Sequence, residues 1–315
     1  NALSGSTVAI TGGAGFIGAN LVRMLLKLDY KVTVFDNFST GRYAYLEGLP
    51  VDIVEGDVLD RDLLVEVIRS HQSIIHLAAQ TGVPGSLIDP YQDCEANVVG
   101  TLNVLEACRA AKDSSDTKMS QKIIFASSNA PLGRQIPPAS EDKAPLPVSP
   151  YGASKLAAEA YCLAYYGSWG LNTIVLRFGN VYGPFSEHKG SVVAEFFKAI
   201  CNNNVITMHG DGEQTRDFVY VADLCRSVLL ALDCDEVGEV YQIATGIETS
   251  INRLVEMVQD VSGSDTSIYK APTRHGDVRK NYSMIVKARD MLGWDPEVNL
   301  DLGLRKTYEW FVNYT

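Results

Sequence analysis

The chain has 315 residues, of which 46% are hydrophobic and 21% charged, a composition that indicates a folded globular protein and excludes a disordered or fibrous one. A formal net charge of -11 argues against nucleic acid or an anionic membrane as the main partner. No stretch has the apolar length of a membrane span and the first residues do not resemble a secretory signal, so we expect a cytoplasmic protein that does not bind membranes.

The cysteines stand singly, without a CxxC pair or a short spacing to a histidine. We therefore predict reduced thiols and no metal site.

Short apolar runs alternate with longer amphipathic stretches through the first half of the chain. The predicted buried strands are 7–11, 31–36, 51–55, 73–77, 122–127 and 172–178. The helical patterns between them cover 17–27, 61–69, 91–111 and 151–167. This order predicts an α/β fold, a doubly wound parallel (Rossmann) sheet with helices on both faces, and such sheets bind ligands at the carboxyl ends of their strands.

After Asn180 the alternation changes, which predicts a second, smaller lobe at the C-terminal side. A helix is expected over 191–203, and loops rich in glycine and charge follow. The helical pattern at 221–232 and the apolar run 240–243 predict a return to the sheet before the chain leaves again in a helix over 250–262. We expect a cofactor domain formed by 1–180 with the return segment 217–246, and a substrate lobe formed by 181–216 and 247–315.

A glycine-rich turn follows the first predicted strand. Gly13, Gly15 and Gly18 are in G-x-G-x-x-G register, and Gly12, Gly15 and Gly18 are in G-x-x-G-x-x-G register. Both spacings allow a tight turn from strand to helix and let backbone N–H groups approach a pyrophosphate. A structural turn can use the same residues, but the strand before and the apolar helix after favour a dinucleotide site.

Two acidic residues support this interpretation. Asp36 ends the second strand, where a carboxylate accepts the adenosine ribose hydroxyls and repels a 2′-phosphate, so NAD is favoured over NADP. Asp57, after the third strand, could bind the adenine amino group or could open the next helix.

Tyr151 and Lys155 are four residues apart at the start of a predicted helix and therefore lie on one face. A tyrosine of normal pKa is a poor base near neutral pH, but a nearby ammonium and a positively charged nicotinamide both favour the phenolate. The spacing is common by chance, and the dinucleotide pattern upstream gives it catalytic meaning.

Over nearly its whole length the sequence resembles the extended short-chain dehydrogenase/reductase family, and within it the UDP-sugar 4-epimerases. The matching segments include the glycine turn, Asp36-Asn37, Gly56-Asp57-Val58, His76 to Gln80, Asn97 to Thr101, Ser127-Ser128, Tyr151 to Lys155, Arg177 to Pro184 and Arg216 to Val221. The resemblance implies NAD contacts from Gly12, Gly15, Phe16, Ile17, Gly18, Asp36, Asn37, Asp57, Val58, Leu77, Ala78, Ala79, Asn97, Tyr151, Lys155 and Phe178.

The resemblance also implies catalytic roles. Tyr151 would take the proton of the sugar 4-hydroxyl, Lys155 would hold the nicotinamide ribose and lower the pKa of the tyrosine, and Ser128 would bond the reacting oxygen. Family members that dehydrate or decarboxylate sugars carry acidic residues after this serine, whereas this chain has Asn129-Ala130, which favours an epimerase. Pro131-Leu132 departs from the usual Val-Tyr and removes a hydroxyl near the sugar.

On the substrate side the resemblance assigns Ser128, Asn180, Arg216, Arg274, Asp277 and Asn281 to the UDP-sugar. The two arginines would bind its diphosphate. Asn281 stands where a bulky tyrosine restricts related enzymes to simple hexoses, so we hypothesise a pocket that also admits N-acetylhexosamines or a uronate.

The resemblance also implies a homodimer, because family members pair through helices equivalent to 97–111 and 151–167. Two alternatives remain open. One is a nucleotide-4-ketosugar reductase or other nucleotide-sugar oxidoreductase, and the other is a non-catalytic NAD-sensing protein, for which an intact Ser128, Tyr151 and Lys155 would be unnecessary.

Overall fold

A parallel sheet forms the centre of the computed structural model, which describes residues 5–113, 121–273 and 278–314. Its seven strands lie in the order β11-β6-β5-β4-β1-β2-β3 and all pair in parallel. The strands are β1 (Thr7–Thr11), β2 (Lys31–Asp36), β3 (Asp52–Glu55), β4 (Ser73–His76), β5 (Lys122–Ser128), β6 (Asn172–Phe178) and β11 (Glu239–Ile243). The chain winds outward from β1 in both directions, which confirms the doubly wound sheet.

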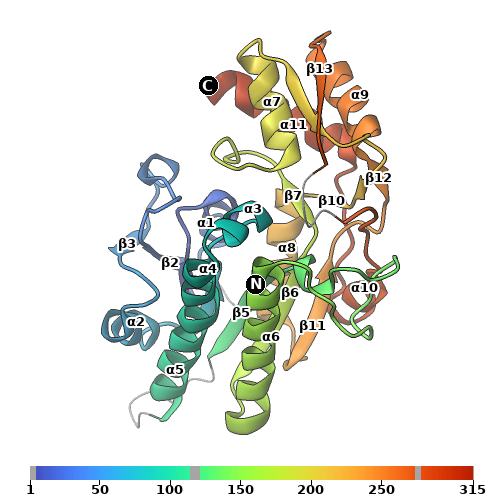
Figure 1. Cartoon of the computed structure of the whole chain (residues 1–315). Helices are drawn as coiled ribbons and strands as arrows, with labels where there is room; N and C mark the ends of the chain where they lie inside the picture. Colours follow the sequence, from blue (N-terminus) through green and yellow to red (C-terminus); the bar gives the residue numbers. More distant parts are fainter. Residues whose placement is uncertain (1–4, 114–120, 274–277, 315) are drawn as a thin grey trace.

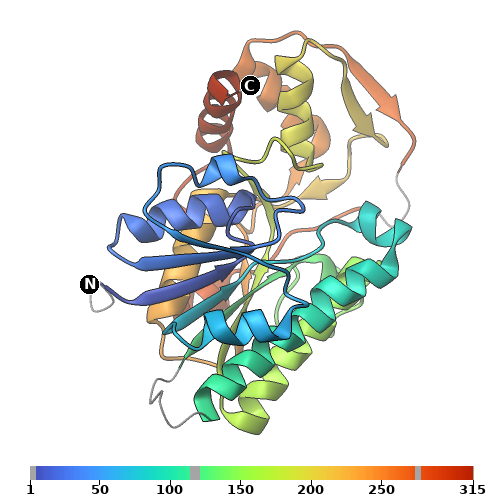
Figure 2. The ribbon, with the colours of Figure 1, turned by 90° about the vertical axis from the view of Figure 1, so that its left-hand side faces the viewer.

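Helices cover both faces of this sheet (Figures 1 and 2). One face packs against α2 (Arg61–Ile68), α5 (Gly100–Asp113) and α6 (Pro150–Trp169). The other packs against α1 (Phe16–Leu26), α8 (Val221–Asp233) and α10 (Val286–Leu292). Because both faces are buried, the strands are continuous apolar runs, and this pattern made the sequence-based strands accurate to within one residue at each end.

The helix expected over 91–111 is wrong as a single element. The structure has α4 (Pro90–Cys94), a π-helical turn η2 (Glu95–Val99) and α5 in its place. The Asp89 carboxylate accepts the backbone N–H of Gln92 and so starts α4 just before Pro90. The periodicity of apolar residues does not reveal the π-helical turn, because the apolar side chains before and after it still face the sheet.

The small lobe lies above the carboxyl ends of the strands (Figure 1). Its core is formed by α7 (Val192–Cys201), α9 (Ile251–Ser262) and α11 (Leu300–Tyr314). Its paired strands are β7 (Asn180–Tyr182) with β10 (Phe218–Tyr220), β8 (Ile206–His209) with β13 (Ile268–Ala271), and β9 (Thr215–Arg216) with β12 (Thr249–Ser250). Short turns complete the chain: α3 (Val83–Ile88), η1 (Tyr43–Tyr45) and η3 (Ala130–Leu132). These short strands, α10 and α11 are additional to the sequence-based expectation.

No helix among the described residues is long and apolar enough to span a bilayer.

A buried ion pair fastens α6 to the sheet. Glu159 and Arg177 are 2% and 4% exposed, and the guanidinium donates two hydrogen bonds to one carboxylate oxygen, at 3.1 and 2.7 Å, and one to the other at 3.0 Å. Glu159 also accepts a hydrogen bond from the Ser127 hydroxyl. The pair therefore ties the middle of α6 to β5 and β6 together.

Glu159→Ala should lower the free energy of unfolding by about 3–5 kcal/mol, because it leaves the buried Arg177 guanidinium without its carboxylate. Urea unfolding followed by circular dichroism measures this. The matched control is Glu256→Ala, which removes an exposed partner of Arg253 and should cost less than about 1 kcal/mol. Equal losses in the two variants would contradict the anchoring role.

Candidate active site

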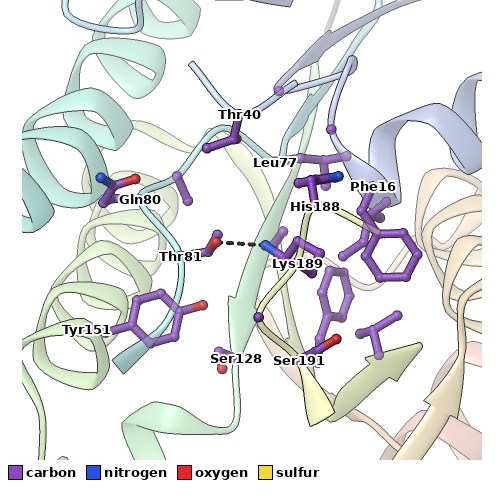
Figure 3. A pocket seen from close by; sticks show the side chains of 18 of the residues that line it. Phe16, Thr40, Leu77, Gln80, Thr81, Ser128, Tyr151, His188, Lys189 and Ser191 are labelled. Carbon is purple, nitrogen blue, oxygen red and sulfur yellow. Dashed lines mark hydrogen bonds between the residues drawn. The ribbon is translucent and has the colours of Figure 1, made fainter. Parts of the chain in front are cut away.

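A cavity of about 1110 Å³ lies between the carboxyl edge of the sheet and the small lobe. Most of the residues singled out from the sequence line it. They are Gly12, Gly15, Phe16, Ile17, Gly18, Asp36, Asn37, Asp57, Val58, Leu77, Ala78, Ala79, Ser128, Tyr151, Lys155, Phe178, Asn180 and Arg216. Figure 3 shows side chains from both the sheet and the small lobe pointing into this space.

The glycine turn brings backbone close to backbone at one end of the cavity. Gly12 has φ 71°, and a Cβ there would lie 2.6 Å from the Ala78 nitrogen. A Cβ on Gly18 would lie 2.6 Å from the Gly12 carbonyl oxygen. Only glycine fits at these two positions, so the turn can pack this closely. The first turn of α1 borders the cavity, and its N–H groups and helix dipole suit a pyrophosphate.

The acidic residues at the ends of β2 and β3 are part of one network. The Asp36 carboxylate accepts the backbone N–H groups of Ala14, at 2.9 Å, and Phe38, at 2.8 Å. Each oxygen keeps a second acceptor position that suits a ribose hydroxyl. Asp57 accepts a hydrogen bond from the Asn37 amide at 2.7 Å, and Asp60, not Asp57, caps the next helix. The residues thus fit the adenosine half of NAD.

Ser128, Tyr151 and Lys155 meet at the opposite end of the cavity. Ser149 caps α6 by accepting the Gly152 N–H, so the tyrosine and the lysine occupy the first turns of this helix beside the end of β5. The Lys155 ammonium is 3% exposed and donates to the Ala126 carbonyl at 2.9 Å. Burial lowers the pKa of Lys155 to about 8, with Asp93 acting in the opposite direction.

Burial also raises the pKa of Tyr151 to about 12. The Ser128 hydroxyl acts against this increase, and the buried Asp93 adds to it. With the groups of the chain alone the pKa of Tyr151 is therefore raised, because desolvation outweighs the hydrogen bond from Ser128.

Two residues near this end of the cavity lie where the sequence did not predict them. Asn97 does not line the cavity: it is 1% exposed and fixes the loop after β4 by bonding both the N–H and the carbonyl of Gln80. Asp93 was missed, because only the packing of α4 against α6 brings its carboxylate near Tyr151 and Lys155.

On the substrate side the predicted residues divide into three groups. Asn180 and Arg216 line the cavity, and the arginine is held by hydrogen bonds to the carbonyls of Thr215, at 2.6 Å, and Val278, at 2.8 Å. Asn281 is not among the lining residues. Arg274 and Asp277 lie outside the described residues.

The position after Ser128 offers no acid or base to the cavity. The Asn129 amide is buried and donates to the Ser283 hydroxyl at 3.0 Å, away from the lining residues. Pro131 and Leu132 are buried in η3. The titratable side chain that contacts Ser128 in the cavity is therefore the phenol of Tyr151.

A dinucleotide cradle on a Rossmann sheet, followed by a tyrosine and a lysine one helical turn apart beside a serine, defines an NAD-dependent enzyme of the extended short-chain dehydrogenase/reductase type. Comparison with known proteins gives the family. The model of the NAD dependent epimerase/dehydratase family matches residues 8–244, and the chain belongs to this family.

Similar proteins cover almost the whole chain. A putative UDP-glucose 4-epimerase of Methanocaldococcus jannaschii is 36% identical over 97% of this chain and 98% of its own length. The structure of UDP-glucose 4-epimerase with UDP-glucose from Thermotoga maritima is 35% identical, with a TM-score of 0.90 over 97% of this chain and 98% of that one. The structure of UDP-N-acetylglucosamine 4-epimerase from Methanobrevibacter ruminantium in complex with UDP-N-acetylmuramic acid is 33% identical. Its TM-score is 0.92, over 99% of this chain and 100% of that one.

Gly18→Ala should abolish NAD retention, because its methyl group would overlap the Gly12 carbonyl and push the first turn of α1 out of position. The measurement is the NAD released on acid denaturation of the purified protein. Gly167→Ala, near the end of α6 where a Cβ meets nothing within 4 Å and the backbone is helical, is the control and should keep its NAD. Full retention in Gly18→Ala would contradict the cradle.

The lowered pKa of Lys155 predicts a pH-dependent stability. Between pH 8 and 10.5 the unfolded chain keeps this proton while the folded chain loses it, so Lys155 makes the free energy of unfolding rise with pH over this range. Comparing urea unfolding of the wild type and Lys155→Met at several pH values isolates this contribution. If the difference between the two curves is the same at pH 8 and pH 10.5, the depressed pKa is wrong.

Proposed function

We propose that this protein is an NAD-dependent epimerase that inverts C4 of a UDP-sugar through a transient 4-keto intermediate. The observation that carries the proposal is the position of Tyr151, Lys155 and Ser128 at one end of a cavity whose other end is a dinucleotide cradle. The ligand-bound relatives that match nearly the whole chain support the UDP-sugar as substrate.

Each residue has a definite task in this reaction. The residues of the cradle would hold NAD, which would supply a hydride acceptor at C4. The Tyr151 oxygen takes the proton of the 4-hydroxyl and gives it back after the keto sugar has turned its other face, while Ser128 bonds the reacting oxygen. Lys155 and the oxidised nicotinamide supply the positive charge that offsets the burial of the phenolate. The hydride that leaves is the hydride that returns, so the cofactor is unchanged overall.

The division of labour between the lobes supports the same proposal. Residues 1–180 with 217–246 would hold NAD. Residues 181–216 with 247–315 would hold the nucleotide sugar, although α10, within the second of these ranges, packs on the sheet. Asn180 and Arg216 would contact the substrate, with Arg216 on its diphosphate. Arg274, Asp277 and the effect of Asn281 on sugar size stay predictions.

The alternatives are less well supported. A 4-ketosugar reductase would consume reduced cofactor stoichiometrically, and a sensing protein would not need the buried catalytic groups. A homodimer through α5 and α6 stays a prediction. It is supported by exposed aromatic side chains on α6, where Tyr161 is 39%, Tyr166 40% and Trp169 47% exposed. The cytoplasmic location also stays a prediction.

Tyr151→Phe should reduce kcat for UDP-sugar interconversion by about 10²–10⁴-fold while NAD stays bound, because only the proton-transfer group is lost. The assay incubates purified protein with a panel of UDP-sugars, without added cofactor, and resolves the products by chromatography. The control is Tyr161→Phe, a partly exposed tyrosine on the same helix that does not line the cavity. Unchanged turnover in Tyr151→Phe would remove the catalytic assignment.

A further inference from the structure

Lys189 is a cavity residue that the reaction described above does not use. It lies in the loop between β7 and α7, and its ammonium donates a hydrogen bond to the Thr81 hydroxyl at 2.7 Å. Figure 3 shows this side chain crossing the cavity so that its nitrogen, Thr81, Tyr151 and Ser128 surround a common space. The amine thus faces the place where the reacting part of the sugar must lie.

The loop holds this amine in a fixed position. The Lys189 N–H donates to the Ser186 carbonyl at 2.9 Å, and the Lys189 carbonyl accepts from the Lys198 ammonium at 3.1 Å. Glu187 is bound by Arg42 at 2.8 Å and by the Tyr45 hydroxyl. The loop is therefore fastened to both the small lobe and the cofactor domain, which prepositions the amine before any ligand binds.

The charge of this ammonium is not matched by an acid of the chain. Within the described residues no carboxylate lies within salt-bridge distance of Lys189. The acids nearest to it in sequence have other partners: Glu187 is paired with Arg42 and Glu195 with Lys198. Burial lowers the pKa of Lys189, and its charge in turn helps to lower the pKa of Lys155. A desolvated ammonium bonded to a neutral hydroxyl gains strongly from an anion that enters the cavity.

The other anions of the two ligands already have partners elsewhere. The glycine turn suits the cofactor pyrophosphate, and Arg216, from β9 of the small lobe, suits the sugar diphosphate. Tyr151 and Ser128 fix the sugar by its 4-oxygen, and the substituent of the adjacent ring carbon C5 lies next to this oxygen. We propose that Lys189 selects a UDP-hexuronate by binding the carboxylate that replaces the hydroxymethyl group at C5. This inference rests on the proposed function, and it specifies the substrate class of the same site.

The test compares UDP-glucuronate with UDP-glucose, which differ in this carboxylate alone. The wild type should have the higher kcat/KM for UDP-glucuronate. Lys189→Met, which keeps the length of the side chain but removes its charge, should lower kcat/KM for UDP-glucuronate by about 10²–10³-fold, because the carboxylate loses its charge-assisted hydrogen bond inside the cavity. The loss for UDP-glucose should be at least about tenfold smaller than the loss for UDP-glucuronate, because the effect of the Lys189 charge on Lys155 is common to both substrates and only UDP-glucuronate also loses a carboxylate contact. Lys189→Arg should retain most of the preference, and Lys31→Met, an exposed lysine outside the cavity, should change neither.

Calorimetric binding of both nucleotide sugars to the NAD-loaded protein separates this inference from the proposed function. If neither sugar is epimerised but UDP-glucuronate still binds in a Lys189-dependent way, the epimerase proposal fails and the role of Lys189 stands. If Lys189→Met weakens both sugars equally, or leaves UDP-glucuronate unaffected, the inference is overturned. It is also overturned if the variant releases NAD without changing the sugar preference, because the amine would then serve a cofactor phosphate.

Discussion

The contact of helix α6 with the carboxyl ends of β5 and β6 is the constraint on which the rest of the site depends. Lys155 binds the Ala126 carbonyl, and one turn further along the helix Glu159 binds Arg177. Both interactions are buried, so each is strong only while α6 stays packed at its present position on the sheet. Tyr151, one turn before Lys155, is thereby held beside Ser128, and a small movement of α6 would separate the phenol from the reacting oxygen.

Burial makes the neutral forms of the catalytic groups favourable. It raises the pKa of Tyr151 and lowers the pKa of Lys155, so the chain alone favours a phenol and moves the lysine toward a neutral amine. A proton shuttle of this kind needs positive charge close to the phenol at the moment of reaction. Lys189 adds a further cation to the same cavity. The chain carries a net charge of -11, and Lys155 and Lys189 bring positive charge to the end of the cavity that holds Tyr151, whereas Asp36 and Asp57 bring negative charge to the cofactor end.

Much of the cofactor half was predictable from local patterns. The strands of the sheet, the glycine turn and the four-residue spacing of Tyr151 and Lys155 depend on residues close in sequence. The break of the 91–111 helix was not predictable, because a π-helical turn keeps the apolar face in register. The hydrogen bonds of Asn97 to Gln80 and the position of Asp93 were not predicted for a related reason: their partners belong to other elements, and the sequence does not say which side chains those elements bring together.

The sequence by itself determined the fold class, and it predicted the dinucleotide cradle and the pairing of Tyr151 with Lys155, since these follow from continuous apolar runs, from a spacing of one helical turn and from glycines placed between a strand and a helix. Tertiary structure alone decided the direction of the Tyr151 pKa, the place of Asn97 behind the cavity wall, and the entry of Lys189 into the cavity. These depend on burial and on distances between segments far apart in the chain. Desolvation and charge pairing are properties of the packed protein, and no local spacing contains them.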